Sequence, residues 1–301
     1  MMGLINCYSE FSVQVSESSS CSNYKNVSSC VSPNLPPSIQ TAATNLYKTT
    51  LSTGNHHLIT VTWCRNATTQ GLQVSSGDDP TMAFRLNTNS RLFRKKKGSK
   101  AFEINNSKFE VFYDLSSAQY YAGAEPVEGY YVLVMVDSEL ALFVGDMAEE
   151  AVVKKVKTNK QTAKFSLLSR REHFYGNTFY ATKAQFSDAG TCHDIMIQCT
   201  GDNDGVKYPS LSVSIDKRVV IRVKRLQWNF RGNQTIFVDG LSVDLMWDVH
   251  DWFFNTGSRS GSGSGQAVFL FRTRNGLDSR LWLEDKVKKK EFSLLIYATK
   301  S

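Results

Sequence analysis

The strongest constraint on the fold is a two-residue alternation of apolar and polar side chains in the segment from Ser210 to Phe254. Val219, Ile221 and Val223 alternate with mainly cationic neighbours, which is typical of a strand with one buried face. A second alternating run, Leu241–Asp248, has the same character. Because a single sheet with an apolar face is not stable alone, the segment predicts at least four strands packed on a partner layer.

Similar short alternating segments recur from Leu58 to Thr299 and are separated by polar or glycine-containing turns. They predict an all-β protein, an antiparallel two-sheet β-sandwich of the jelly-roll or concanavalin-like kind with one or two short helices. Helical apolar spacing predicts those helices at residues 39–48 and 146–156, the second with Asp146 as a candidate N-cap.

Composition predicts two regions along the chain. Residues 1–38 are rich in Ser and Asn and poor in large apolar groups, which predicts a disordered tail. Residues 39–301 are predicted to form a single β-sandwich domain, because hydrophobic residues make up 41% of the sequence and suffice for one core. Residues 255–265, of the sequence NTGSRSGSGSG, are predicted to be a flexible loop within that domain.

The sequence has no apolar run of signal-peptide or membrane-span length, which predicts an intracellular protein, cytoplasmic or nuclear, that is neither secreted nor transmembrane. Six cysteines without a CxxC pair favour reduced thiols, as in those compartments. In an alternative, translation starts at Met2 and Gly3 carries a lipid.

Six runs of residues form a recognisable set: Arg94–Lys100, Asp114–Ala118, Ala181–Ala184, Lys224–Asn233, Trp247–Phe254 and Phe292–Tyr297. Together they resemble a plant family catalogued as a domain of unknown function, DUF868. The resemblance covers residues from about Gln40 to the end of the chain and brings no known activity, ligand or cofactor. The turn Ile215–Arg218 departs from the family pattern, because a Gly is expected after its Asp.

A looser resemblance is to concanavalin-like sandwiches, in which a strand bearing His-Asp is followed by a hairpin with an Asp at its tip. His193 and Asp194 followed by Asp216 fit this order. The resemblance implies a topology and no function.

Catalytic and metal-binding patterns are missing from the sequence. Asp244 and Asp248 share a strand face, but about 13 Å separates them, and glycosidase carboxylates lie about 5 to 9.5 Å apart. The His and Cys residues lack metal-ligand spacing, and no nucleophile elbow, phosphate loop or dinucleotide fingerprint occurs. The sequence therefore predicts a protein that is not an enzyme and has no cofactor or metal.

The first candidate binding site is a segment rich in Lys and Arg. The segment 91–100 holds six cations and no acid, within a chain of net charge +7. It is a candidate for binding nucleic acid or an anionic membrane surface, the alternative being a solvated turn with Gly98 at its bend. Trp228 and Phe230 are candidates for base stacking beside such cations. The candidate anion-binding residues are Arg91, Arg94, Lys95, Lys96, Lys97, Lys100, Arg218, Arg222 and Lys224.

Asp248, His250 and Trp252 form a second candidate ligand face, because alternate residues of a strand share one side. Trp63, Trp247 and Trp252 are best interpreted as core residues, and in the alternative an exposed Trp252 would stack on a sugar ring. The function predicted from the sequence is an intracellular, non-enzymatic interaction module for an unknown protein or glycan partner. The alternatives are a binder of nucleic acid or anionic lipid through residues 91–100, and a carbohydrate-binding or carbohydrate-active protein.

Overall fold

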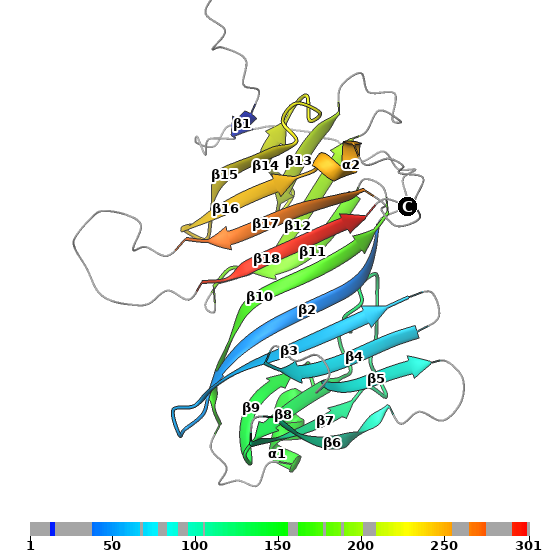
Figure 1. The fold of residues 1–301 in the computed structure, drawn as a ribbon, viewed down its shortest axis with the longest axis vertical. Coiled ribbons are helices and arrows are strands. Elements are labelled where there is room, and N and C mark those ends of the chain that lie inside the picture. Colours follow the sequence, from blue (N-terminus) through cyan, green and yellow to red (C-terminus); the bar gives the residue numbers. More distant parts are fainter. Residues whose placement is uncertain are drawn as a thin grey trace, which may run out of the picture. The chain divides into compact units, whose positions relative to one another are not determined.

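The computed structural model of the chain describes residues 13–15, 38–66, 69–77, 83–89, 96–104, 106–155, 162–176, 179–187, 190–200, 209–254, 265–274 and 291–299. Strands dominate these residues, and Figure 1 shows them with two short helices. The helices are α1 (Ala148–Lys155) and α2 (His250–Phe254). The strands are β1 (Val13–Val15), β2 (Ile39–Thr50), β3 (His56–Arg65), β4 (Thr69–Ser76), β5 (Ala83–Asn89), β6 (Lys97–Ile104), β7 (Ser107–Asp114), β8 (Tyr131–Val136), β9 (Glu139–Val144), β10 (Lys164–Tyr175), β11 (Phe179–Gln185), β12 (Cys192–Thr200), β13 (Ser210–Ile215), β14 (Arg218–Val223), β15 (Arg231–Val238), β16 (Leu241–Asp248), β17 (Gln266–Thr273) and β18 (Ser293–Thr299).

The strands form three sheets (Figure 1). The nine-stranded sheet has the order β15-β16-β17-β18-β10-β2-β3-β4-β5, the five-stranded sheet β1-β14-β13-β12-β11, and the four-stranded sheet β6-β7-β8-β9. The chain divides into two compact units. Unit 1 comprises residues 1–38, 175–269 and 298–301, and unit 2 comprises residues 39–174 and 270–297.

The core of unit 2 lies between the four-stranded sheet and strands β2 to β5. Strand β3 supplies Ile59, Val61 and Trp63, each with no exposed surface, as its period-2 alternation requires. Strand β8 faces them with Val132 and Val134, also fully buried. Trp63 and Tyr130 pack edge to face here, with ring centroids 5.4 Å apart and ring planes at 88°.

Strand β8 is buried on both faces because a helix covers the side away from this core. Every residue of Tyr131–Val136 is buried. Leu133 and Met135 pack with Ala148 and Ala151 of α1 in a separate apolar cluster. Apolar residues on both sides of β8 therefore reflect a sandwiched strand, although the hairpin partner β9 lies at the edge of its sheet.

Unit 1 buries the inward residues of the five-stranded sheet. Leu211, Val213 and Ile215 alternate with half-buried serines along β13. Tyr180 of β11 contacts Trp252 of α2 and Phe269 of β17, with ring centroids 6.1 and 6.4 Å apart. The aromatic residues that sequence alternation assigns to the interior therefore meet in this layer.

Gly232 of β15 allows its strand to pair with a bulky neighbour. It lies opposite Trp247 of β16 in the antiparallel register. A Cβ atom at position 232 would lie 2.2 Å from a ring carbon of Trp247, well below any normal contact. The Trp247 indole occupies that space and donates its Nε1 hydrogen to the carbonyl of Asn229 at 2.9 Å.

The structure confirms a mostly β, antiparallel architecture with two short helices. It does not confirm the two-sheet jelly-roll or concanavalin-like arrangement, because the described strands form three sheets. The helix expected at residues 146–156 is confirmed as α1. The carboxylate of Asp146, the expected N-cap, accepts the backbone N–H groups of Gly129 and Tyr130 at 3.0 and 3.1 Å.

The helix predicted at residues 39–48 is wrong, because this segment is strand β2. Its inward positions include Asn45 and Thr49, which are 2% and 0% exposed. Because polar residues lie on the buried face, β2 lacks the alternation of apolar and polar residues that marks a strand. Its extended conformation is set by pairing with β3.

Two predicted regions fall mainly outside the described residues. From the predicted tail, residues 1–38, only β1 and Ser38 are described, and β1 pairs with β14 in antiparallel register. Of the predicted loop 255–265, only Gly265 is described. The single domain expected over residues 39–301 stays a prediction. Among the described residues, no helix is long and apolar enough to span a membrane.

Candidate functional site

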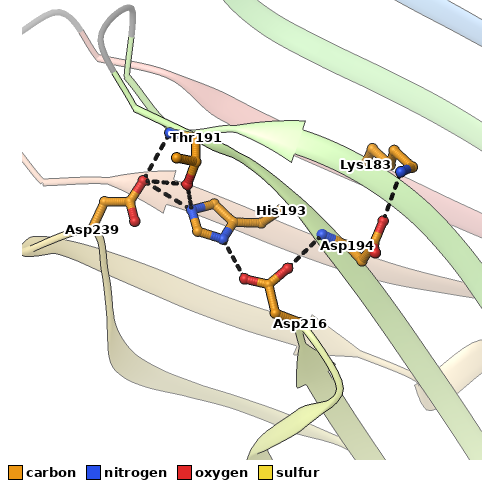
Figure 2. Close-up of polar contacts among 6 residues, drawn as sticks. All are labelled: Lys183, Thr191, His193, Asp194, Asp216 and Asp239. Carbon is orange, nitrogen blue, oxygen red and sulfur yellow. Dashed lines mark hydrogen bonds and ion pairs between the residues drawn. The ribbon is translucent and has the colours of Figure 1, made fainter.

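A polar cluster in unit 1 is built on the tips of two hairpins (Figure 2). Asp216 and Lys217 join β13 to β14, and Asp239 and Gly240 join β15 to β16. All four have positive φ, at 49° and 67° in the first turn and 49° and 73° in the second. Two-residue turns of this kind match the twist of the strands and favour Asp or Asn first and Gly second. Each turn therefore carries an Asp carboxylate at the end of its hairpin.

His193 of β12 lies between these two carboxylates. Its Nδ1 is 2.6 Å from Asp216 Oδ2, and its Nε2 is 2.9 Å from Asp239 Oδ2 (Figure 2). The imidazole is 9% exposed, whereas the two carboxylates are 55% and 33% exposed. Burial alone would lower the pKa of His193, but the hydrogen bonds to Asp216 and Asp239 outweigh it and raise that pKa. The ring is favoured as an imidazolium with both nitrogens donating.

The same carboxylates bind the backbone of β12 and of the segment before it. Asp216 accepts the N–H of Asp194 at 2.9 Å, and Asp239 accepts the N–H of Thr191 at 3.1 Å. The hydrogen bonds to His193 and to these backbone groups lower the pKa of both carboxyls. The cluster thus fixes two hairpin tips to one strand end by charge-assisted hydrogen bonds.

Thr191, His193 and Asp216 have the distances of a hydroxyl–imidazole–carboxylate triad. Thr191 Oγ1 is 3.1 Å from His193 Nε2, and the other ring nitrogen faces Asp216 (Figure 2). A general base must have a free nitrogen to accept the hydroxyl proton. Here Asp239 faces that nitrogen, and Thr191 Oγ1 also donates to Asp239 at 3.2 Å. The arrangement therefore favours a structural clamp over an activated nucleophile.

One ring nitrogen of His193 faces Asp216 and the other faces Asp239, so the three side chains do not converge on one point. Among the described residues, no group of three or more His, Cys, Asp or Glu side chains is arranged to hold a metal ion. The topological analogy associated His193 with Asp216 but not with Asp239. The Asp-Gly pair at 239–240 is a strong hairpin signal, and it is the sequence feature from which the tip of the β15–β16 hairpin could have been predicted.

The predicted basic site at residues 91–100 is described only in part. Arg91, Arg94 and Lys95 lie outside the described residues. Lys96 and Lys100 are exposed, and Lys97 binds Asp114 at 2.7 Å. Gly98, placed at a bend in the alternative interpretation, lies within strand β6, so the predicted turn does not occur there.

The other predicted cations lie on a different sheet. Arg218 and Arg222 are exposed on β14, and Lys224 is exposed immediately after it. Strand β14 pairs with β13 and β1, whereas β6 pairs with β7. The two sets of cations therefore do not lie on neighbouring strands.

The predicted ligand face of Asp248, His250 and Trp252 is wrong as a strand face. Strand β16 ends at Asp248, and helix α2 begins at His250. Asp248 accepts the N–H of His250 at 3.0 Å, a local turn that starts the helix. Trp252 then faces the core and is 2% exposed, which removes the expected stacking surface.

The structure instead exposes Trp228, on a segment that we term the aromatic loop (residues 224–231). The indole is 78% exposed. The loop around it is braced, because the N–H of Trp228 donates to Arg225 at 2.9 Å and the Asn229 side chain donates to the carbonyl of Lys224 at 2.9 Å. Leu226, with no exposed surface, anchors the loop in the interior.

Three further rings lie at the end of the aromatic loop. Phe230 contacts His250 and Phe254, with ring centroids 5.2 and 5.8 Å apart, and Phe254 is 55% exposed. The Arg231 guanidinium lies over the Phe230 ring at 5.6 Å and binds Asp248 at 2.8 Å. An exposed Trp, a ring cluster and a stacked guanidinium together offer flat faces for a planar ligand.

Unit 2 holds a second polar cluster, around Arg170 of β10. Its guanidinium binds Glu125 at 2.6 Å and Glu172 at 2.5 Å, and it donates to Asn45 at 3.1 Å. The Glu172 side chain has no exposed surface. Burial alone would lower the pKa of Arg170, but Glu125 and Glu172 raise it, so the guanidinium stays charged. Tyr47 lies near this cluster, and its own burial, together with Glu125, raises its pKa.

The fold and these surfaces define a strand-rich protein with a charge cluster on hairpin tips and a braced aromatic loop. The chain belongs to a plant family, because the model described as plant protein of unknown function (DUF868) matches residues 38–300. This match confirms the resemblance seen in the sequence motifs. No curated protein and no solved structure matches the chain.

Proposed function

We propose that the protein is a non-enzymatic binding module whose ligand contacts the aromatic loop. The observation that carries the proposal is Trp228, a large apolar side chain that is 78% exposed on a braced loop. An exposed indole on a fixed backbone loses little conformational entropy when a ligand covers it. Such side chains are typical of binding surfaces, where Trp and Arg dominate the binding energy.

The charge cluster around His193 supports the non-enzymatic part of the proposal. Its hydroxyl–imidazole pair is the one triad-like arrangement identified among the described residues, and Asp239 occupies the nitrogen that a base would need. We further propose an intracellular location. Cys64 and Cys192 are exposed thiols that form no disulfide, which suits a reducing compartment.

The test compares the full-length chain with its Trp228→Ala variant on three panels: polynucleotides, soluble glycans and anionic vesicles. Phe237→Ala is the matched control, because Phe237 is 76% exposed on β15, outside the aromatic loop. We expect one class to bind the wild type and the control and to lose affinity for Trp228→Ala. Equal binding by all three proteins, no binding to any class, or turnover of a bound substrate would contradict the proposal.

A further inference from the structure

The charges around the aromatic loop define the chemistry of its ligand. The segment 217–231 contains six cations and no acid, and all six cations are exposed. Residues 91–100 hold as many cations in fewer positions, but that segment contains no tryptophan, whereas this one contains the exposed Trp228. The cations are Lys217, Arg218, Arg222, Lys224, Arg225 and Arg231.

The backbone of β14 directs its cations to one face of the sheet. Ile221 and Val223 are fully buried, so Arg222 between them points to the opposite side of the sheet. Lys224 is exposed immediately after the strand. Arg222 lies opposite Ser212 of β13 on one side and Gln14 of β1 on the other.

The acids nearest to this surface are bound by other side chains. Asp248 is held by Arg231 at 2.8 Å, and Asp251 is held by His250 at 2.9 Å. Asp216, at the tip of the β13–β14 hairpin, is held by His193. These contacts reduce the repulsion that an approaching anion would meet.

We propose that the ligand of the aromatic loop is a single-stranded nucleic acid. Its bases stack on Trp228 and on the exposed edge of the Phe230–Phe254 cluster, and its phosphates face Arg222 and Lys224. Sequence-tolerant single-strand sites combine such aromatic faces with a cationic track. A duplex conceals its base faces, and a neutral glycan has no charge for the cations to bind, so a single strand uses both features of this surface. This inference rests on the proposed function, because both need the aromatic loop.

The experiment measures the fluorescence anisotropy of a labelled 12-nucleotide single strand, as RNA and as DNA, with the full-length chain. Trp228→Ala is expected to weaken binding about 5- to 150-fold, the range found for loss of one stacked base. The double variant Arg222→Gln/Lys224→Gln is expected to reduce the slope of log affinity against log salt by about 1.4, or about 0.7 for each lost phosphate contact. Equal or unequal affinity for RNA and DNA both support the proposal, and the difference reports contacts to the ribose hydroxyl.

Two controls separate this surface from general charge effects. Phe237→Ala removes an exposed ring elsewhere, and Lys164→Gln removes an exposed cation in unit 2. Both should bind like the wild type. Equal affinity for duplex and single strand, or binding that Lys96→Gln/Lys100→Gln abolishes and Trp228→Ala does not, would overturn the inference.

The failure of the inference can be distinguished from the failure of the proposed function. If glycans or vesicles bind through Trp228 and single strands do not, the nucleic-acid inference fails and the binding module stands. If no panel member depends on Trp228, both fail.

Discussion

Both units place one cation between two carboxylates, but the surroundings of the two clusters differ. In unit 2, Arg170 joins Glu125 and Glu172, and the Glu172 side chain is 0% exposed. In unit 1, His193 joins Asp216 and Asp239, whose side chains are 55% and 33% exposed. A guanidinium stays charged at any physiological pH, whereas an imidazolium titrates. The charge of the central cation is therefore permanent in unit 2, where it stabilises a buried carboxylate, and depends on pH in unit 1, where the carboxylates are partly exposed.

Removal of Arg170, whose partner Glu172 is fully buried, should have the largest effect. Arg170→Met leaves Glu172 buried without its counter-ion, and we expect a loss of about 3 to 5 kcal/mol in the free energy of unfolding. Urea denaturation followed by circular dichroism measures this loss. Arg171→Met is the matched control, because Arg171 is the exposed neighbour on β10. Equal losses of stability in the two variants would show that the ion pairs of Arg170 do not stabilise the fold.

Removal of His193, whose partner carboxylates are partly exposed, should cost less. His193→Gln leaves Asp216 and Asp239 in contact with water, and we expect a loss of about 1 to 2 kcal/mol from the charge-assisted hydrogen bonds. The same denaturation experiment measures it. His56→Gln is the control, because His56 is exposed and hydrogen-bonds only to the Thr50 hydroxyl among the contacts described. A loss as large as that of Arg170→Met would remove the distinction between the clusters.

The two clusters should differ most clearly in their response to pH. The pKa of His193 is raised in the folded state, so its stabilisation is complete below its unfolded pKa and is lost as pH rises through the folded pKa. The pKa values of Asp216 and Asp239 are lowered, so their stabilisation is complete above the unfolded values and is lost on acidification. The cluster should therefore stabilise the fold most between about pH 4 and about pH 6.5.

Unfolding free energies of the wild type and His193→Gln, measured at pH 5.5 and pH 8.5, check this window. The difference between the two proteins should be larger at pH 5.5. The Arg170 guanidinium does not titrate over the same range, so the wild type keeps this charge at both pH values. A His193→Gln penalty that does not change with pH would mean that the imidazole remains in one protonation state.

The smallest predicted effect concerns the hairpin tip that carries Asp216. Lys217 has a φ of 67°, where the equivalent residue of the other tip is Gly240 at 73°. Lys217→Gly removes the steric cost of a Cβ in this conformation, and we expect about 0.5 kcal/mol of added stability. Lys217→Ala keeps the Cβ and loses the charge, so a thermal unfolding temperature raised equally by both variants would assign the effect to charge.

The sequence predicted strands well where burial and alternation agree, as in β3, β13 and β16. It failed at β2, because Asn45 faces inward to donate to Glu125 and accept from Arg170. In this buried network, polar residues occupy inward positions that apolar residues occupy in an ordinary strand. The partners of Asn45 are distant in the sequence, so a short stretch of sequence does not reveal that Asn45 is buried.

The site residues show the same limit. His193 and Asp239 are separated by 46 positions and belong to strands and turns of different sheets, so only the tertiary structure of unit 1 brings them together. Trp252 is buried, as the core interpretation predicts, but the ligand face with Asp248 and His250 does not form, because the turn at Asp248 is followed by a helix. The exposure of Trp228 also follows from tertiary packing, since Leu226 rather than the indole enters the core.

The close approach of Gly232 to Trp247 has an evolutionary consequence. A side chain at position 232 and an indole at position 247 exclude each other sterically, so the two positions must change together during divergence. A homologue with Ala or Ser at the first position is expected to carry a smaller residue at the second. This pair can be used to align distant members whose loops have diverged beyond comparison.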